Sequence, residues 1–124
     1  MKLRSWIDEH YNSEARFDYC LIGGDTANCH HDKNTHDEEA MMKQTLEVHS
    51  TLKTIFQCKM FFVPGNHDCK QFFNGQSDYD DFYNIHNKRM ELAEGLDIVG
   101  FGGSVPAYVN GQVYWLGFPY SNQD

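Results

Sequence analysis

The stretch FFVPGNHDCK, residues 61–70, joins a short apolar run to a Pro-Gly turn and then to three consecutive polar side chains. The apolar run is typical of a buried strand, and the Pro-Gly turn ends it. Asn66, His67 and Asp68 follow directly after the turn. Functional groups of open α/β sheets gather just beyond the carboxyl ends of strands. We therefore expect these three side chains to lie at such an edge and to carry chemistry.

A second apolar run, FDYCLIGG at residues 17–24, ends in two glycines directly before Asp25. Its composition predicts a strand that is buried on both faces of a parallel sheet. The loop that follows, GGDTANC, contains Asp25 and Asn28. If the two strands are neighbours, this loop lies beside the PGNHD loop, because parallel strands end at the same edge of a sheet.

The elements around these strands predict an α/β fold. Apolar residues at three- and four-residue spacing predict a short helix over residues 3–10 and a long helix that ends near Phe56. The order strand, helix, strand is a crossover unit, which makes the two strands parallel. We expect a layered α/β fold with a mixed, mostly parallel sheet flanked by helices.

The second half of the chain predicts one more helix and further strands. Residues 79–94 have helical spacing, with Gly95 as the helix stop. LDIVGFGG, residues 96–103, predicts a strand, and Asn110-Gly111 between β-prone flanks predicts an antiparallel hairpin. No repeat or linker divides the 124 residues, so we expect one domain.

Composition limits the partners of this domain. The formal net charge is −8, with 18 acidic and 10 basic residues, which argues against binding to nucleic acid. Apolar runs are too short for a membrane span, and no signal stretch is present. The four cysteines show no C-x-x-C spacing, so we expect a reduced, cytoplasmic protein. A metal cation is the more natural partner: carboxylate, amide and imidazole together suit Mn, Fe, Zn or Mg.

GGDTAN and PGNHD, each after an apolar strand and separated by a helix, resemble the motifs of the calcineurin-like metallophosphoesterase family. IVGFGGSVP, residues 98–106, is similar to the strand and loop that come next in many members. The resemblance implies metal-dependent hydrolysis of phosphate esters through a two-metal site. It also implies two divalent metal ions as cofactors and a phosphorylated substrate, whose class stays open.

The resemblance implies a role for each residue of the two motifs. Asp25 matches the carboxylate that bridges the two metal ions, and Asn66 the amide ligand of the second metal, which also touches the phosphate. His67 matches the catalytic imidazole that stabilises the transferring phosphoryl group and gives a proton to the leaving oxygen. Asp68 would orient His67 or support the loop. Asn28 would face the substrate in the cleft.

Two motifs of the family are missing at the places where the family has them. D-x-H should stand on a strand before the helix at residues 3–10, but the sequence starts at that helix; G-H-x-H should follow the segment that ends at Asp124 and occurs nowhere in the chain. We therefore expect residues 1–124 to be a partial domain that lacks the N-terminal strand and the C-terminal portion. This prediction implies an exposed strand edge, weak metal binding and no activity of the chain alone. The alternative is a degenerate, noncatalytic member that acts as a binding or scaffold module.

Each assignment has a structural alternative. Asp25 taken alone is typical of a strand end or a helix N-cap. The run of residues 29–36 includes a cysteine and three histidines but matches no standard zinc spacing, so we interpret it as a polar loop. The acidic residues 37–39 suit a first helical turn. Histidines on helical faces are by default buried or half-buried packing residues. These alternatives concern Cys29, His30, His31, His36, His10, His49 and His86.

Overall fold

Three short parallel strands form the centre of the computed structural model, which describes residues 2–11, 16–28, 37–74, 79, 81–115 and 117–121. β1 (Tyr19–Ile22), β2 (Lys59–Phe62) and β3 (Phe82–Asn84) are arranged in the order β1-β2-β3. Tyr19 is opposite Lys59, and Met60 is opposite Phe82. The expected parallel pairing of the first two strands, and with it the α/β class, is confirmed.

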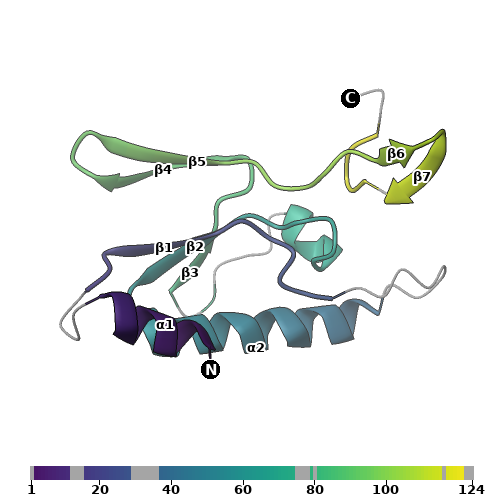
Figure 1. Cartoon of the computed structure of the whole chain (residues 1–124). Helices are drawn as coiled ribbons and strands as arrows, with labels where there is room; N and C mark the ends of the chain where they lie inside the picture. The colour runs from purple at the N-terminus through teal and green to yellow at the C-terminus, as the bar shows by residue number, and fades with distance from the viewer. Residues whose placement is uncertain are drawn as a thin grey trace.

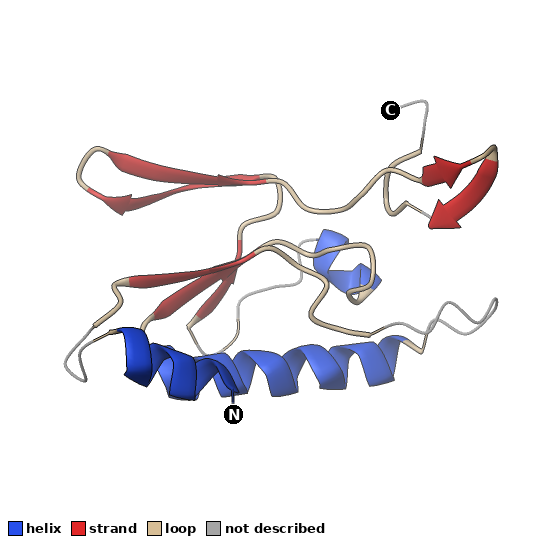
Figure 2. Ribbon diagram, viewed as in Figure 1, coloured by secondary structure: helices blue, strands red, loops and turns tan. Residues whose placement is uncertain are grey.

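Two helices cover one side of this sheet (Figures 1 and 2). They are α1 (Lys2–His10) and α2 (Glu38–Phe56), close to the predicted positions. Asp37 caps α2, because its Oδ1 accepts a hydrogen bond from Ala40 N at 3.0 Å. Glu38 and Glu39 lie in the first turn, where negative charge is favourable. The structural interpretation of the acidic run is therefore confirmed.

Two hairpins lie on the opposite side of the sheet (Figure 2). β4 (Lys88–Ala93) pairs antiparallel with β5 (Leu96–Gly100), and β6 (Ala107–Val109) pairs antiparallel with β7 (Gln112–Trp115). The second hairpin turns at Asn110-Gly111, as the sequence predicted. A 3-10 helix, η1 (Lys70–Asn74), follows β2. The described helices include none long and apolar enough to cross a membrane.

The prediction of a helix over residues 79–94 is wrong. β3 and β4 lie within this stretch, and Gly95 forms the turn of the β4-β5 hairpin instead of ending a helix. Asp81, Asn87 and Gly95 have φ values of 68°, 55° and 74°, which a right-handed helix excludes. His86 follows β3, forms an isolated bridge with Gly100 of β5, and therefore does not lie on a helical face.

Large apolar side chains between α2 and the sheet make the core. Its buried members come from the first loop, α2, β2, β3 and the segment after β2; they are Ala27, Met41, Met60, Phe62, Cys69, Phe72 and Phe82. Phe72 and Phe82 are each 2 % exposed, so core packing accounts for these two aromatic side chains. Cys20, Cys58 and Cys69 are free thiols.

The core also buries a histidine. His49 on α2 is fully buried, is stacked on Phe82 with ring centroids 4.8 Å apart, and forms a hydrogen bond through Nδ1 to the Tyr79 hydroxyl. Burial lowers the pKa of His49 from 6.5 to about 4, although the charge of Asp68 acts in the opposite direction. Burial and the charge of Asp68 raise the pKa of Tyr79. The imidazole therefore packs as a neutral group. Its burial agrees with the default interpretation of His49, although Nε2 has no hydrogen-bond partner among the described residues.

β1 is an edge strand among the described elements, since it pairs with β2 alone. Leu21, in the middle of β1, is 62 % exposed. Together with Val63, Val99 and Phe101 it lines an apolar groove of about 380 Å³ between the parallel sheet and β5. An open strand edge next to apolar surface favours pairing with another chain.

Acidification should weaken the fold through His49. The pKa of His49 is lower in the folded chain, so the unfolded chain binds more protons between pH 4 and pH 6.5. The stabilisation that comes from the neutral His49 is fully present above pH 6.5 and is lost as the pH falls to 4. The free energy of unfolding should fall by about 2 to 3 kcal/mol over this range. Urea unfolding across this range should show a steeper pH dependence for the wild type than for His49→Gln. The same pH dependence of the free energy of unfolding in both proteins would contradict the lowered pKa of His49.

A charge on β1 should reduce self-association. Leu21→Lys places an ammonium at the open edge, which opposes strand pairing, and should change the free energy of unfolding by no more than about 0.5 kcal/mol. Leu46→Lys is the control, because Leu46 is 40 % exposed but lies on α2, away from any strand edge. Sedimentation velocity at equal concentrations should show less association for Leu21→Lys alone. Equal reduction by both variants would mean that added charge, and not the strand edge, is responsible.

Candidate functional site

The two predicted motif loops lie side by side at the carboxyl ends of β1 and β2. Ile22 is opposite Phe62, so the segments that begin at Gly23 and Val63 leave the sheet together. The Val63 amide still donates to Ile22 O at 3.1 Å. The His67 amide donates to Asp25 Oδ1 at 3.0 Å, which joins the second motif directly to the first. The structure thus brings Asp25 together with the Asn66–Asp68 segment.

Asp25 occupies a left-handed backbone conformation directly after a left-handed glycine. The φ values are 89° at Gly24 and 53° at Asp25. Aspartate is one of the few residues that adopt this conformation at modest cost, and such conformations cluster at functional sites. The residue is exposed, and the hydrogen bond from the His67 amide engages its Oδ1. One oxygen of this carboxylate is therefore held by the protein.

Glycines allow this close approach of the two loops. A Cβ on Gly65 would collide with Asp25 Oδ1, and a Cβ on Gly24 would collide with the Gly65 backbone. No larger residue fits at either position without moving the other loop. The observed position of Asp25 therefore depends on glycine in both turns.

The carboxylate of Asp68 holds both loops. Its Oδ1 accepts from Thr26 N at 2.7 Å, Thr26 Oγ1 at 2.8 Å and Ala27 N at 3.0 Å. Its Oδ2 accepts from Asp25 N and Gly65 N, each at 2.8 Å. Asp68 is 2 % exposed, and the three successive amides of the first loop form a concave anion site around it. We call this arrangement the Asp68 clamp.

The other candidate residues differ in how they are placed. Asn66 and His67 are half-buried beside Asp25, and the bond to Asp25 uses the backbone of His67, so its imidazole is not needed for it. Asn28 is exposed, and its amide donates to Gln44 Oε1 on α2 at 2.8 Å. The structure therefore fixes the backbone of Asn28 without assigning a role to its side chain. Cys29, His30, His31 and His36 lie outside the described residues.

The donors of the site fit part of a divalent-metal centre. Asp25 and Asn66 carry the carboxylate and amide oxygens that Mg²⁺ and Mn²⁺ prefer, and such ions keep several water ligands. Among the described residues, however, no group of three or more His, Cys, Asp or Glu side chains could enclose an ion. These residues thus offer ligands for one ion and no separate ligand set for a second.

Sequence reasoning missed the residues of α2 that support the loops. Glu38 Oε2 accepts from Cys69 Sγ and Lys70 N, both at 2.8 Å. Burial is the main cause that raises the pKa of the Cys69 thiol to about 11, and the hydrogen bond to Glu38 is the second. Because a protonated thiol is a poor nucleophile and a poor metal ligand, Cys69 has a structural role. Thr45 is buried and contacts Thr26. A threonine on the apolar face of a predicted helix was the available signal for this contact.

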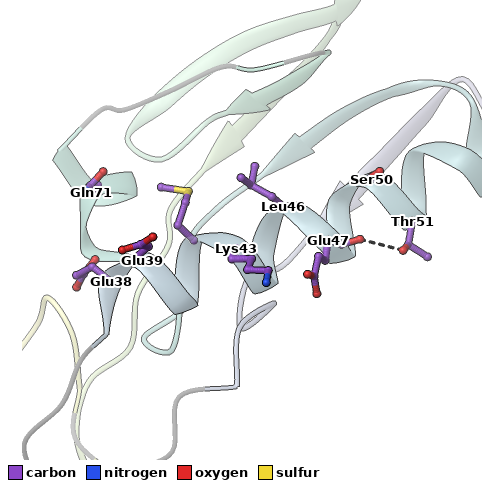
Figure 3. Close-up of a pocket in the computed structure, with 9 residues that line it drawn as sticks. Glu38, Glu39, Lys43, Leu46, Glu47, Ser50, Thr51 and Gln71 are labelled. Atoms are coloured by element: carbon purple, nitrogen blue, oxygen red, sulfur yellow. Dashed lines mark hydrogen bonds between the residues drawn. The ribbon is translucent and has the colours of Figure 1, made fainter.

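A wide recess of about 870 Å³ lies along α2 and reaches η1 (Figure 3). Side chains of α2 and Gln71 of η1 line it, whereas Asp25, Asn66 and His67 do not. Its surface mixes acidic residues with Met42 and Leu46. Size alone does not make it the functional site, because the residues that the sequence predicts as metal ligands and proton donor lie on the strand-end loops.

The comparison with known families gives one match. The model of the calcineurin-like phosphoesterase family matches residues 2–121. Neither a curated protein nor a solved structure matches the chain. The match spans both motif loops, the helices and the hairpins.

Loss of the Asp68 carboxylate should destabilise the fold strongly. Asp68→Ala leaves five donors without their acceptor, four of them backbone amides, and should lower the free energy of unfolding by about 3 kcal/mol or more. Asp37→Ala is the matched control, because Asp37 also accepts a backbone amide but is exposed; it should cost about 1 kcal/mol. Urea unfolding measures both. A loss for Asp68→Ala no larger than that for Asp37→Ala would disprove the clamp.

Proposed function

Because the chain belongs to the calcineurin-like phosphoesterase family, we propose that it takes part in metal-dependent hydrolysis of phosphate esters at the loops after β1 and β2. The observation that carries this proposal is the hydrogen bond from His67 N to Asp25 Oδ1. It brings a carboxylate, an amide and an imidazole to one edge of the sheet. Metal-dependent hydrolysis of a phosphoester can use a metal ligand and a proton donor in this combination.

Asp25 and Asn66 would hold the metal. In the two-ion site that we propose, Asp25 and Asn66 would be the ligands from the described residues, and further ligands would have to come from elsewhere in the protein. Divalent ions such as Mn, Fe, Zn or Mg would supply positive charge that stabilises the phosphoryl oxygens. The hydrogen bond from the His67 amide to Oδ1 restrains the orientation of the Asp25 carboxylate.

His67 and Asp68 have separate tasks in this proposal. The imidazole of His67 donates a proton to the leaving oxygen and stabilises the phosphoryl group. Asp68 acts as a positioning residue, because its two oxygens are already engaged by five donors of the two loops. Of the two roles considered for Asp68, the contacts favour support of the loop. Asn28, at the end of the first loop, would contact the substrate.

A second candidate is a noncatalytic member of the family that acts as a binding or scaffold module. The observation that favours it is the absence, from the described residues, of any cluster of three or more His, Cys, Asp or Glu side chains. The two candidates differ in one measurable property, since the noncatalytic protein would neither bind Mn²⁺ at Asp25 nor hydrolyse a phosphate ester.

Two substitutions should separate metal binding from proton transfer. Asp25→Asn keeps an oxygen for the His67 amide but removes the negative charge, so it should weaken Mn²⁺ binding at least about tenfold. His67→Ala keeps the backbone amide and should leave Mn²⁺ affinity within about twofold, while hydrolysis falls by about two to four orders of magnitude. Mn²⁺ titration and hydrolysis of an aryl phosphate, in the longest chain that the gene encodes, measure the two effects.

His10→Ala is the control, because His10 is an exposed residue of α1 in the helix layer. It should change neither property. Loss of bound Mn²⁺ in His67→Ala would show that His67 is a ligand and not the proton donor. A wild-type protein that binds no Mn²⁺ and hydrolyses no aryl phosphate would support the noncatalytic candidate.

A further inference from the structure

Thr45 is a buried hydroxyl in the middle of the α2 face that packs on the sheet. It is 1 % exposed and lies between Met41 and His49, which are also buried. Threonine in a helix commonly bonds to the carbonyl four residues earlier. Thr51 and Thr54 of the same helix do so, with bonds of 2.9 and 3.0 Å to Glu47 O and Ser50 O; Figure 3 marks the first. Thr45 instead contacts Thr26 of the first motif loop.

The number of hydroxyl protons determines which group donates in each hydrogen bond between Thr45, Thr26 and Asp68. Thr26 Oγ1 lies 2.8 Å from Asp68 Oδ1 and 3.1 Å from Thr45 Oγ1. Thr26 has a single hydroxyl proton, and the carboxylate only accepts, so that proton goes to Asp68. The Thr45 hydroxyl must then donate to Thr26. The result is a chain from Thr45 through Thr26 to Asp68, in which each bond polarises the next.

This chain ends in the group that sets the position of Asp25. Asp68 Oδ1 accepts from Thr26 and Ala27, and Oδ2 accepts from the Asp25 amide. A shift of Thr26 therefore moves the acceptor and the backbone on which Asp25 depends. The long helix α2 is the rigid side of this arrangement, because its first turn is also tied to the second loop through Glu38.

We propose that Thr45 is a positioning residue of the metal site, whose hydroxyl fixes Thr26 against Asp68 and thereby fixes the Asp25 carboxylate. This proposal rests on the proposed function as far as it concerns metal. Its structural part, the fixing of the first loop by Thr45, holds with or without an ion.

The first test measures the loop in the absence of metal. Thr45→Val keeps the volume of the side chain and removes the hydroxyl, whereas Thr45→Ser keeps the hydroxyl and removes a methyl group. Thr51→Val removes a hydroxyl that bonds only within α2. Amide hydrogen exchange of Asp25, Thr26 and Ala27 should be about fivefold faster in Thr45→Val, and unchanged in the other two variants. The Ile85 amide, bonded to Phe62 O, reports on opening elsewhere and should not change.

The second test measures metal binding in the longest chain that the gene encodes. Thr45→Val should weaken Mn²⁺ binding about threefold to tenfold, less than the loss typical of a group that contacts a metal ligand directly. Thr45→Ser should bind as the wild type does, even where its lost methyl group lowers stability. The electron paramagnetic resonance spectrum of bound Mn²⁺ should broaden in Thr45→Val alone, because the ligand is less well fixed.

The outcomes separate this proposal from the proposed function. Unchanged exchange at Asp25, Thr26 and Ala27 in Thr45→Val overturns it, whatever the metal does. Faster exchange with unchanged Mn²⁺ affinity also overturns it, because the hydroxyl would then hold the loop without positioning the ligand. If Mn²⁺ affinity across the three variants changes in step with the free energy of unfolding, and not with the presence of the Thr45 hydroxyl, then packing alone is responsible. That result also overturns the proposal. A wild-type chain that binds no Mn²⁺ counts against the proposed function, and hydrogen exchange then decides the role of Thr45.

Discussion

The buried carboxylate of Asp68 is the interaction on which the geometry of the site depends. Parallel strands bring two loops to one edge of a sheet, but nothing in strand pairing fixes how the loops lie against each other. Asp68 does this, because it collects amides from both loops in one buried place. Burying a carboxylate is costly unless its oxygens are satisfied, and here five donors satisfy them.

The clamp constrains the sequence around it in a way that sheet pairing does not. Three successive amides converge on one carboxylate only if the chain turns sharply after β1, which requires left-handed φ values at Gly24 and Asp25. The second loop then has room for glycine alone at position 65. The motifs GGDTAN and PGNHD are thus two halves of one structural unit, and substitution in either half affects the other.

Local patterns predicted the elements whose partners are close in sequence. The apolar runs before Asp25 and Asn66 and the spacing of α2 gave the crossover unit, because burial on both faces and helical periodicity leave clear signatures. The stretch of residues 79–94 misled, since Tyr79, Phe82, His86 and Met90 have helical spacing. In the structure, more buried and more exposed side chains alternate along two strands instead. Phe82 and Asn84 are buried in β3, and Met90 and Leu92 are half-buried in β4. Tertiary pairing with β2 and β5 overrode the local pattern.

The candidate site was predictable only as far as its motifs reach. Asp25, Asn66 and His67 could be named because their types and positions match a known pattern. Their supports could not, because Thr26, Glu38 and Thr45 are ordinary residues whose role arises from contacts 19 to 42 positions away in the chain. Asn84 is similar: it is buried in β3 and bonds to Phe72 O, a contact that no periodicity announces.

The structure also separates what the fold requires from what only chemistry explains. Asp68, the two glycines and Thr26 are needed for the loops to meet, so a noncatalytic relative would keep them as readily as an enzyme. The charge of Asp25 is different. An asparagine could adopt the same left-handed backbone and accept the His67 amide through its oxygen. The fold therefore uses Oδ1 of Asp25 and gives no structural reason for the negative charge. The metal ion that we propose at this carboxylate would supply the reason.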